Sequence, residues 1–201
     1  MGKTNKNAPQ KGSKIKVEPI KNLDDINLIK RMLNEKHRDL AIFTLGINTN
    51  LRASDLVRIE TLQVKYLSAG DSFEVKEKKT KKQKRITLNQ TCVHAIQTLL
   101  HDKNFKPTGI YLFQSKKTFG MEPLTVQRLH ALVKSWCKNL KLKGNYGSHT
   151  LRKTFGYHQR VTFNASIEQL MVCFNHSNQR QTLDYLCIQP EEIKKIYMNE
   201  L

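Results

Sequence analysis

Apolar residues recur at helical spacing along most of the chain, and short polar stretches separate one such segment from the next. The first segment, residues 23–33, carries Ile26 and Ile29 on one face and begins beside a capping residue, Asn22 or Asp24. The same spacing predicts helices at 38–47, 90–100, 125–140, 166–174 and 191–201, a short helix from residue 51, one capped by Ser148 and one carrying Tyr185. The chain is therefore expected to be mainly helical.

Residues 72–88 follow a different pattern. Apolar and polar residues alternate around Phe73 and again around Ile86, which predicts two strands of an antiparallel hairpin. Residues 109–113 are apolar and short enough to be either a strand or a buried connector. The predicted fold is one mainly α domain with a small antiparallel sheet.

The net charge of the chain indicates what kind of partner it binds. The 201 residues include 35 Lys and Arg against 17 Asp and Glu, a formal net charge of +18. A field of this sign attracts polyanions, and nucleic acid is the commonest soluble one. A highly solvated surface and docking on anionic lipid are the alternatives. Residues 1–20 are mostly basic and polar, and we expect either an arm along a phosphate backbone or a tail without a role.

Several function classes receive no support. No apolar run approaches membrane-spanning length, and the first residues lack the apolar core of a signal peptide. The four cysteines are scattered without a CxxC pair, which favours reduced thiols of a cytoplasmic protein over a disulfide or zinc framework. No acidic cluster with metal-ligand spacing is evident, so neither a metal nor a cofactor is expected.

Candidate chemistry gathers between residues 148 and 185. His149 and Arg152 are three apart on one predicted helix, so they share a face. His176 and Tyr185 follow. The resulting set of two imidazoles, a guanidinium and a phenol can bind a phosphate and supply a nucleophile to attack it. Each residue alone has an ordinary explanation as a helix-start residue, a surface ion pair, a cap or a core tyrosine.

Two upstream segments offer further cations. Arg52 lies at the start of the short helix, where free amides and a guanidinium make an anion site, although it could instead pair with Asp55. Residues 76–85, in the middle of the hairpin, hold seven positive charges and one negative charge. This run is either a solvated turn or a mobile segment from which one lysine enters a cleft and supplies a proton.

These motifs, in this order, resemble the catalytic domain of the tyrosine recombinases, or phage integrase family. The resemblance covers about residues 20–201 and rests on four segments: Leu51-Arg-Ala-Ser-Asp-Leu56, Lys79-Thr80 with Arg85-Ile-Thr-Leu88, Ser148-His-Thr-Leu-Arg152, and His176-Ser177 with Thr182-Leu-Asp-Tyr185. Tyr185 follows His176 by nine positions and His176 follows Arg152 by 24, and both spacings fit the family. Asn175 stands where the family has glycine, and asparagine tolerates the left-handed conformation of such a turn.

The resemblance implies that the enzyme cleaves and rejoins DNA through a 3′-phosphotyrosyl intermediate. The implied catalytic residues are Arg52, Lys79, His149, Arg152, His176 and the nucleophile Tyr185. Lys79 is chosen among neighbouring lysines because a Lys-Thr pair at the end of the first strand fits best. The residues expected to contact DNA are Lys78, Lys81, Lys82, Lys84, Arg85 and Lys153.

Organisation and partners follow from the same resemblance. Residues 21–201 would form the catalytic domain and residues 1–20 an arm or linker, with the family's N-terminal DNA-clamping domain absent. The implied partner is double-stranded DNA, bound by a tetramer in which residues 191–201 dock on a neighbouring subunit, in the cytoplasm at the nucleoid. A type IB topoisomerase-like enzyme and a non-catalytic DNA-binding regulator of the same fold are the alternative functions.

Overall fold

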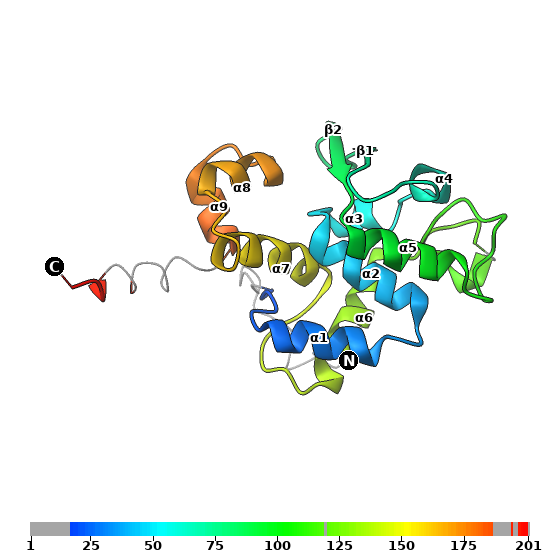
Figure 1. Ribbon diagram of the computed structural model, residues 1–201, viewed down its shortest axis with the longest axis horizontal. Helices are drawn as coiled ribbons and strands as arrows, with labels where there is room; N and C mark the ends of the chain where they lie inside the picture. The colour runs from blue at the N-terminus through cyan, green and yellow to red at the C-terminus, as the bar shows by residue number, and fades with distance from the viewer. Residues whose placement is uncertain (1–16, 119, 187–193, 195–196, 201) are drawn as a thin grey trace, which may run out of the picture.

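A computed structural model describes residues 17–118, 120–186, 194 and 197–200 of the chain (Figure 1). The helix expected over residues 191–201 lies largely outside the described residues. Elsewhere the chain is mainly helical with one two-stranded sheet, as the hydrophobic pattern predicts. The elements are α1 (Leu23–Met32), α2 (His37–Asn48), α3 (Ala53–Leu56), α4 (Thr61–Val64), β1 (Ser72–Lys76), β2 (Gln83–Thr87), α5 (Gln90–Leu100), η1 (Lys116–Thr118), α6 (Val126–Asn139), α7 (Ser148–Val161), α8 (Ile167–Phe174) and α9 (Gln179–Leu186).

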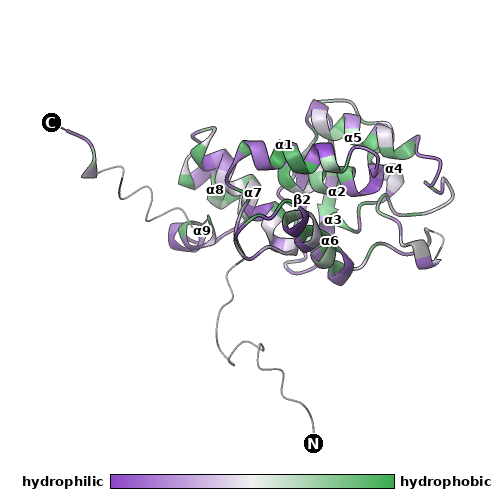
Figure 2. Ribbon diagram, turned by 90° about the horizontal axis from the view of Figure 1, so that it is seen from below, coloured by the Kyte–Doolittle hydropathy of each residue, from purple (hydrophilic) through white to green (hydrophobic). Residues whose placement is uncertain are grey.

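The main core surrounds α2, whose middle residues 41–46 are all buried. This helix packs against α5 and α7, and Phe43 meets Trp136 of α6 edge to face at 5.9 Å. Contact with α7 depends on Gly46, because a Cβ there would lie 2.5 Å from the side chain of Leu151. Figure 2 shows hydrophobic and hydrophilic residues following one another along these helices, as in amphipathic helices. The main core therefore fixes α7 directly against α2.

The β1–β2 hairpin stands beside α3 and places its basic turn next to the helices. Its register pairs Phe73 with Ile86 and ends with Lys76 opposite Gln83. Beyond the last pair, the Glu77 amide donates to the Lys82 carbonyl at 3.0 Å. The turn is thus tied at its base, so the lysines within it start from a defined frame.

The last described helices, α8 and α9, form a small lobe at the far end of α7 (Figure 1). Leu170, Phe174 and Leu186 form a second apolar cluster there, separate from the main core. The lobe meets α7 at Gly156, where an added Cβ would lie 2.5 Å from Leu186 and 2.6 Å from Phe174. Asn175 ends α8 in the left-handed conformation, with φ of 56°, as expected of this asparagine.

Packing begins before residue 21. Ile20, at the end of the stretch expected to be an arm, is buried, and its amide donates to Thr154 Oγ1 of α7 at 2.9 Å. The Ile20 carbonyl accepts from His158 Nε2 at 2.9 Å, which fixes the proton on that nitrogen. Burial lowers the pKa of His158, so the ring is neutral. Residues near Ile20 are therefore part of the domain.

The expected caps and boundaries are mostly confirmed. Asn22, Thr125 and Ser166 each accept a backbone N–H bond at the start of a helix. Helix α7 begins at Ser148, one residue earlier than expected, and Gly147 takes the N-cap position, where its amide donates to the Thr150 hydroxyl. Residues 109–113 are a connector held to Glu60 by a bridge at Tyr111, with Leu112 and Phe113 buried and Ile110 exposed.

Candidate active site

Arg152 lies at the centre of the candidate site. It occupies the buried face of α7 and is 4% exposed. Its Nη2 donates to the Phe174 carbonyl at 3.1 Å, and its guanidinium lies over the Phe174 ring at 5.1 Å. Because Phe174 is the last residue of α8, Arg152 ties the main body to the lobe that carries the tyrosine.

His176 and Tyr185 are brought to the same place by the turn after α8. The His176 ring stacks on Phe174 at 5.2 Å and meets Tyr185 edge to face at 5.5 Å. Its Nδ1 lies 3.0 Å from the hydroxyl of buried Thr182. Burial, followed by the positive charges of Arg152 and Arg52, lowers the pKa of His176 to about 4. The imidazole is therefore neutral at physiological pH.

Arg52 pairs with a residue that the sequence did not single out. Arg52 lies at the start of α3, as expected. Its guanidinium forms an ion pair with Glu77 rather than with Asp55. Glu77 is 2% exposed and also accepts from the Thr80 hydroxyl. Burial alone would raise the pKa of Glu77, but the hydrogen bonds from Arg52 and Thr80 and the charges of Arg52 and Lys84 lower it.

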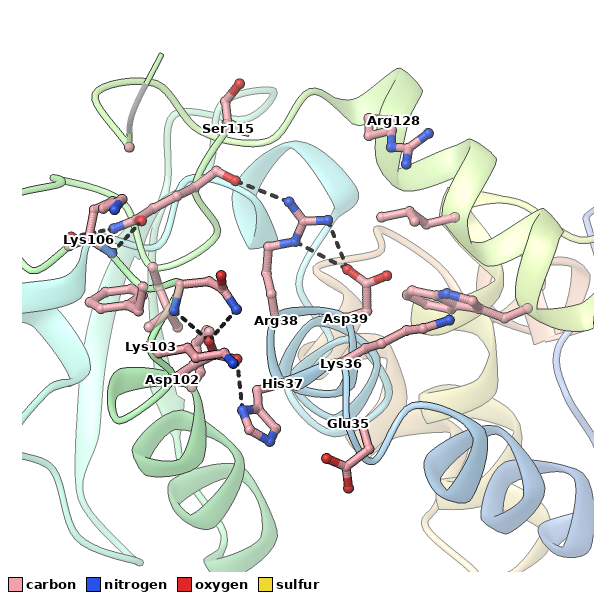
Figure 3. Close-up of a pocket in the computed structure, with 18 of the residues that line it drawn as sticks. Glu35, Lys36, His37, Arg38, Asp39, Asp102, Lys103, Lys106, Ser115 and Arg128 are labelled. Carbon is pink, nitrogen blue, oxygen red and sulfur yellow. Dashed lines mark hydrogen bonds and ion pairs between the residues drawn. The ribbon is translucent and has the colours of Figure 1, made fainter. Parts of the chain in front are cut away.

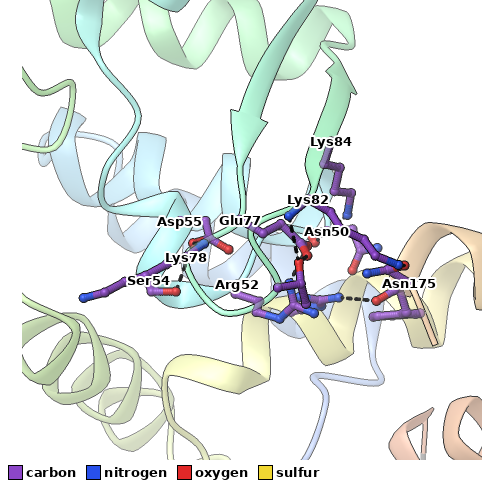
Figure 4. Close-up of polar contacts among 12 residues, drawn as sticks. Asn50, Arg52, Ser54, Asp55, Glu77, Lys78, Lys82, Lys84 and Asn175 are labelled. Carbon is purple, nitrogen blue, oxygen red and sulfur yellow. Dashed lines mark hydrogen bonds and ion pairs between the residues drawn. The ribbon is translucent and has the colours of Figure 1, made fainter. Parts of the chain in front are cut away.

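Asp55, the partner that the sequence offered for Arg52, binds the hairpin instead. Its side chain is 3% exposed and accepts from the Lys78 backbone amide at 3.1 Å (Figure 4). The start of α3 is thus connected to the hairpin twice, through Asp55 and through the Arg52–Glu77 pair. These contacts position Arg52 relative to the basic turn.

Lys84 points from β2 into the site. Its Nζ donates to the Cys173 carbonyl at 2.9 Å and to the Asn50 carbonyl at 3.1 Å (Figure 4). Asn50, also left-handed, donates its side-chain amide to the same Cys173 carbonyl at 2.6 Å. Burial, followed by the charge of Arg152, lowers the pKa of Lys84 to about 8, although Glu77 acts in the opposite direction. The sequence placed Lys84 among the DNA contacts only, yet its alternation with buried Ile86 and Leu88 indicates the inward face.

Lys79 and His149 lie at the exposed side of the site. Both are exposed residues, at the hairpin turn and in the first turn of α7. Although His149 is exposed to solvent on one side, the protein atoms around its ring displace water and are the first cause of its lowered pKa, followed by the positive charges of Arg152, Lys153, His130 and Lys79. The charge of Lys79 therefore reaches His149, which joins the hairpin turn to the motif on α7.

The expected DNA contacts divide into two groups. Lys78, Lys81, Lys82 and Arg85 are exposed on the hairpin, and Lys82 Nζ also donates to Asn175 Oδ1 at 3.3 Å. Lys153 is 7% exposed and its ammonium lies over the Tyr185 ring at 5.1 Å. In the described conformation Lys153 belongs to the site, and its contact with DNA stays a prediction.

A cavity of about 720 Å³ lies elsewhere, between the start of α2, the end of α5 and the middle of α6 (Figure 3). His37 pairs with Asp102 across it at 2.8 Å, and Arg38 pairs with Asp39 at 3.0 Å. Its lining includes none of the candidate-site residues, so the cavity and the candidate site are separate.

Within the described part of the chain, no group of three or more His, Cys, Asp or Glu could hold a metal ion. None of the helices described is long and apolar enough to cross a membrane.

The family match and the individual relatives agree on the class of protein. Residues 21–192 match the phage integrase family. The probable integrase/recombinase YoeC of Bacillus subtilis is 33% identical over 184 residues, which cover 90% of this chain and 95% of that protein. The tyrosine recombinase XerC of Caldanaerobacter subterraneus subsp. tengcongensis is 32% identical over 174 residues, which cover 83% of this chain and 47% of XerC.

Solved structures show the same fold. XerA recombinase superimposes with a TM-score of 0.72 at 16% identity, over 92% of this chain and 68% of XerA. XerH site-specific recombinase, in a post-cleavage complex with its palindromic difH substrate, gives 0.71 at 16% identity, over 94% of this chain and 55% of XerH. A lambda integrase dimer bound to a core site gives 0.63, over 88% of this chain and 62% of that fragment. The chain therefore belongs to the phage integrase family and is an enzyme of the tyrosine recombinase class.

Proposed function

We propose that the chain breaks and rejoins double-stranded DNA by site-specific recombination through a 3′-phosphotyrosyl intermediate. The observation that carries this proposal is the convergence of Arg52, Arg152, His176 and Tyr185, which four separate segments bring around the end of α8. A phosphodiester needs its charge neutralised before an anionic nucleophile approaches. Two guanidinium groups beside a phenol meet that need.

Phosphate binding is assigned to Arg52, Arg152 and His176. A guanidinium carries a fixed charge and a planar set of donors, so each arginine can hold two non-bridging oxygens. His176 is neutral, and when its Nδ1 accepts a hydrogen bond from the Thr182 hydroxyl, its Nε2–H is left as a third donor. Thr182 therefore orients the ring for this role.

Tyr185 is the proposed nucleophile. Its oxygen attacks phosphorus, which stores the energy of the broken bond in a phosphotyrosyl ester and allows rejoining. A phenol has a reference pKa of about 10 and needs a base to take its proton. His149 is the proposed base, because its lowered pKa keeps it neutral and able to accept a proton at pH 7.

The leaving 5′ oxygen needs a proton from a general acid. The family pattern assigns this role to Lys79, whose charge reaches His149. Lys84 is a second candidate because its ammonium lies inside the site. In both cases the donor belongs to the hairpin, which explains why the base of the hairpin is tied to α3.

The proposed assembly is a tetramer on two DNA duplexes, acting at the nucleoid in the cytoplasm. Residues 191–201 would dock on a neighbouring subunit through Ile193, Ile196 and Tyr197, and Tyr197 is 84% exposed. The exposed cations of the hairpin, Lys78, Lys81, Lys82 and Arg85, would contact the phosphate backbone beside the cleaved bond. Residues 21–201 are proposed as the catalytic domain.

A nicked suicide duplex tests this function. Cleavage of such a duplex loses a short 5′ fragment and traps the covalent complex, which runs as a shifted band on a denaturing gel. We expect the band with the wild-type chain and not with Tyr185→Phe, while Tyr66→Phe, at an exposed tyrosine just after α4, retains it. No band with any DNA that the protein binds would favour the non-catalytic regulator, and relaxation of plasmid without paired sites would favour the topoisomerase.

A further inference from the structure

Lys84 occupies a position in the site that the family pattern does not assign to it. On β2 it shares the inward face with Ile86, so its side chain runs beneath the hairpin rather than into solvent. Its ammonium binds the Cys173 carbonyl, and Arg152 binds the next carbonyl, that of Phe174. The two cations therefore lie on adjacent carbonyls at the end of the helix that precedes Tyr185.

We propose that Lys84, rather than Lys79, gives the proton to the leaving 5′ oxygen during cleavage. This assignment rests on the proposed function. Two carbonyls hold the Lys84 ammonium beside the phosphate-binding guanidinium, and a general acid must lie within hydrogen-bond reach of the atom that it protonates.

Electrostatics supports the geometry. A general acid works best when its pKa lies near the operating pH, and burial together with Arg152 lowers the pKa of Lys84 to about 8. Lys79, in contrast, is exposed at the hairpin turn, and the effect of its charge is seen at His149. We therefore assign Lys79 to contact with the DNA backbone.

Cleavage forms one bond to phosphorus, breaks another and moves two protons. The Tyr185 oxygen forms a bond to phosphorus, its proton passes to His149, and the bond from phosphorus to the 5′ oxygen breaks. The electron pair of that bond goes to the 5′ oxygen, which takes a proton from the Lys84 ammonium and leaves as a hydroxyl. In rejoining, the 5′ hydroxyl gives its proton to the neutral Lys84 amine as its oxygen attacks phosphorus. The bond from phosphorus to the Tyr185 oxygen then breaks, and that oxygen takes back its proton from His149.

A substrate with sulfur in place of the bridging 5′ oxygen tests this assignment. A thiolate is a far better leaving group than an alkoxide and needs no proton, so only a variant that lacks the acid is rescued by sulfur. The variants are Lys84→Ala, Lys84→Arg and Lys79→Ala, each compared with wild type on oxygen and sulfur duplexes of the same sequence. Lys84→Arg keeps a positive charge and the donors for the Cys173 and Asn50 carbonyls, but arginine does not release a proton.

On the oxygen duplex we expect both Lys84 variants to form the covalent complex at least 100-fold more slowly than wild type, since general acids contribute roughly 10²–10⁴-fold. On the sulfur duplex we expect both to come within about tenfold of wild type, and Lys79→Ala to show no such gain. Any other rescue pattern, including rescue of Lys79→Ala or of neither lysine, overturns the assignment. Absence of a covalent complex with wild type on both duplexes would instead contradict the proposed function itself.

Discussion

Glu77 is a buried carboxylate in direct contact with Arg52, and it also accepts a hydrogen bond from Thr80 in the hairpin turn. In the DNA-free chain it balances the charge of Arg52, close to Arg152 and Lys84. An incoming phosphate brings a negative charge to the same cations. Glu77 and the phosphate therefore compete for Arg52.

Changing Glu77→Gln separates these effects. Removing one partner of a buried ion pair costs about 3 kcal/mol, so we expect a lower free energy of unfolding without DNA. The cluster of cations becomes more positive, so we expect tighter DNA binding by the same variant. Glu74→Gln, the same charge change at an exposed position of β1, is the matched control for denaturation and DNA titration. Weaker DNA binding by Glu77→Gln would show that the carboxylate mainly positions Arg52.

His176 makes folding sensitive to acid. Its pKa falls from about 6.5 in the unfolded chain to about 4 in the folded one, so the unfolded chain binds the proton more readily. Stability is then full above pH 6.5 and falls as the pH drops toward 4. The difference amounts to about 2 kcal/mol at pH 5 for a buried group, and we expect about 1 kcal/mol for this partly exposed ring.

Thermal unfolding of the DNA-free protein at pH 7.5 and pH 5.0 measures this contribution. We expect His176→Gln to lose less stability between the two values than wild type does, by about 1 kcal/mol. His101→Gln, at an exposed histidine whose ring contacts the Gln97 carbonyl, is the control and should follow wild type. Equal acid sensitivity in all three proteins would mean that the ring is not held neutral by its surroundings.

At the level of elements, the junction between α7 and the α8–α9 lobe decides where the tyrosine lies. Gly156 lets Phe174 and Leu186 approach the backbone of α7. In Gly156→Ala the new methyl group overlaps both side chains, which costs about 1–3 kcal/mol, offset by about 1 kcal/mol of helix propensity. We expect the lobe to shift and covalent-complex formation to fall by tenfold or more.

Limited proteolysis and the suicide duplex together measure this change. We expect faster cleavage within residues 162–180 of Gly156→Ala, because the lobe is less firmly packed. Val161→Ala, at the exposed end of α7, is the control and should behave as wild type. Unchanged proteolysis and activity in Gly156→Ala would show that α7 tolerates the added methyl group.

The sequence predicts most elements because each uses a local signal. Helices α1, α6 and α8 combine apolar periodicity with a capping residue, and the hairpin combines alternation with a polar turn. The short α4 and η1 lack enough residues for a periodic pattern and were not predicted. The order of the motifs predicts that Arg52, Arg152 and Tyr185 share a site, but not which side chains contact one another.

The contacts that remained unpredicted join residues distant in the chain. Neither the Arg52–Glu77 pair nor the reach of Lys84 to Cys173 has a local signal, because both depend on how the hairpin meets α3 and α8. The alternation of Lys84 with Ile86 was a usable sign of its inward direction. A family pattern assigns roles by sequence position, whereas burial and partners decide which lysine can act.

For the whole molecule, we expect the net charge of +18 to supply most of the proposed affinity for DNA. Each cation that contacts a phosphate releases condensed counterions, so log K should fall linearly with log salt. We expect binding, measured by fluorescence anisotropy, to weaken by about 100-fold or more between 50 and 200 mM salt. A flat dependence would contradict binding through phosphate contacts, and equal loss on a random duplex identifies the non-specific part.

The central claim is that Tyr185 becomes covalently joined to DNA. Digestion of the trapped complex with trypsin and nuclease, followed by mass spectrometry, identifies the peptide that carries the nucleotide. We expect a 3′-phosphonucleotide on Tyr185, in the tryptic peptide that begins after Arg180. A nucleotide on another residue, such as Tyr157 or Tyr197, or a complex without any covalent link, would contradict it.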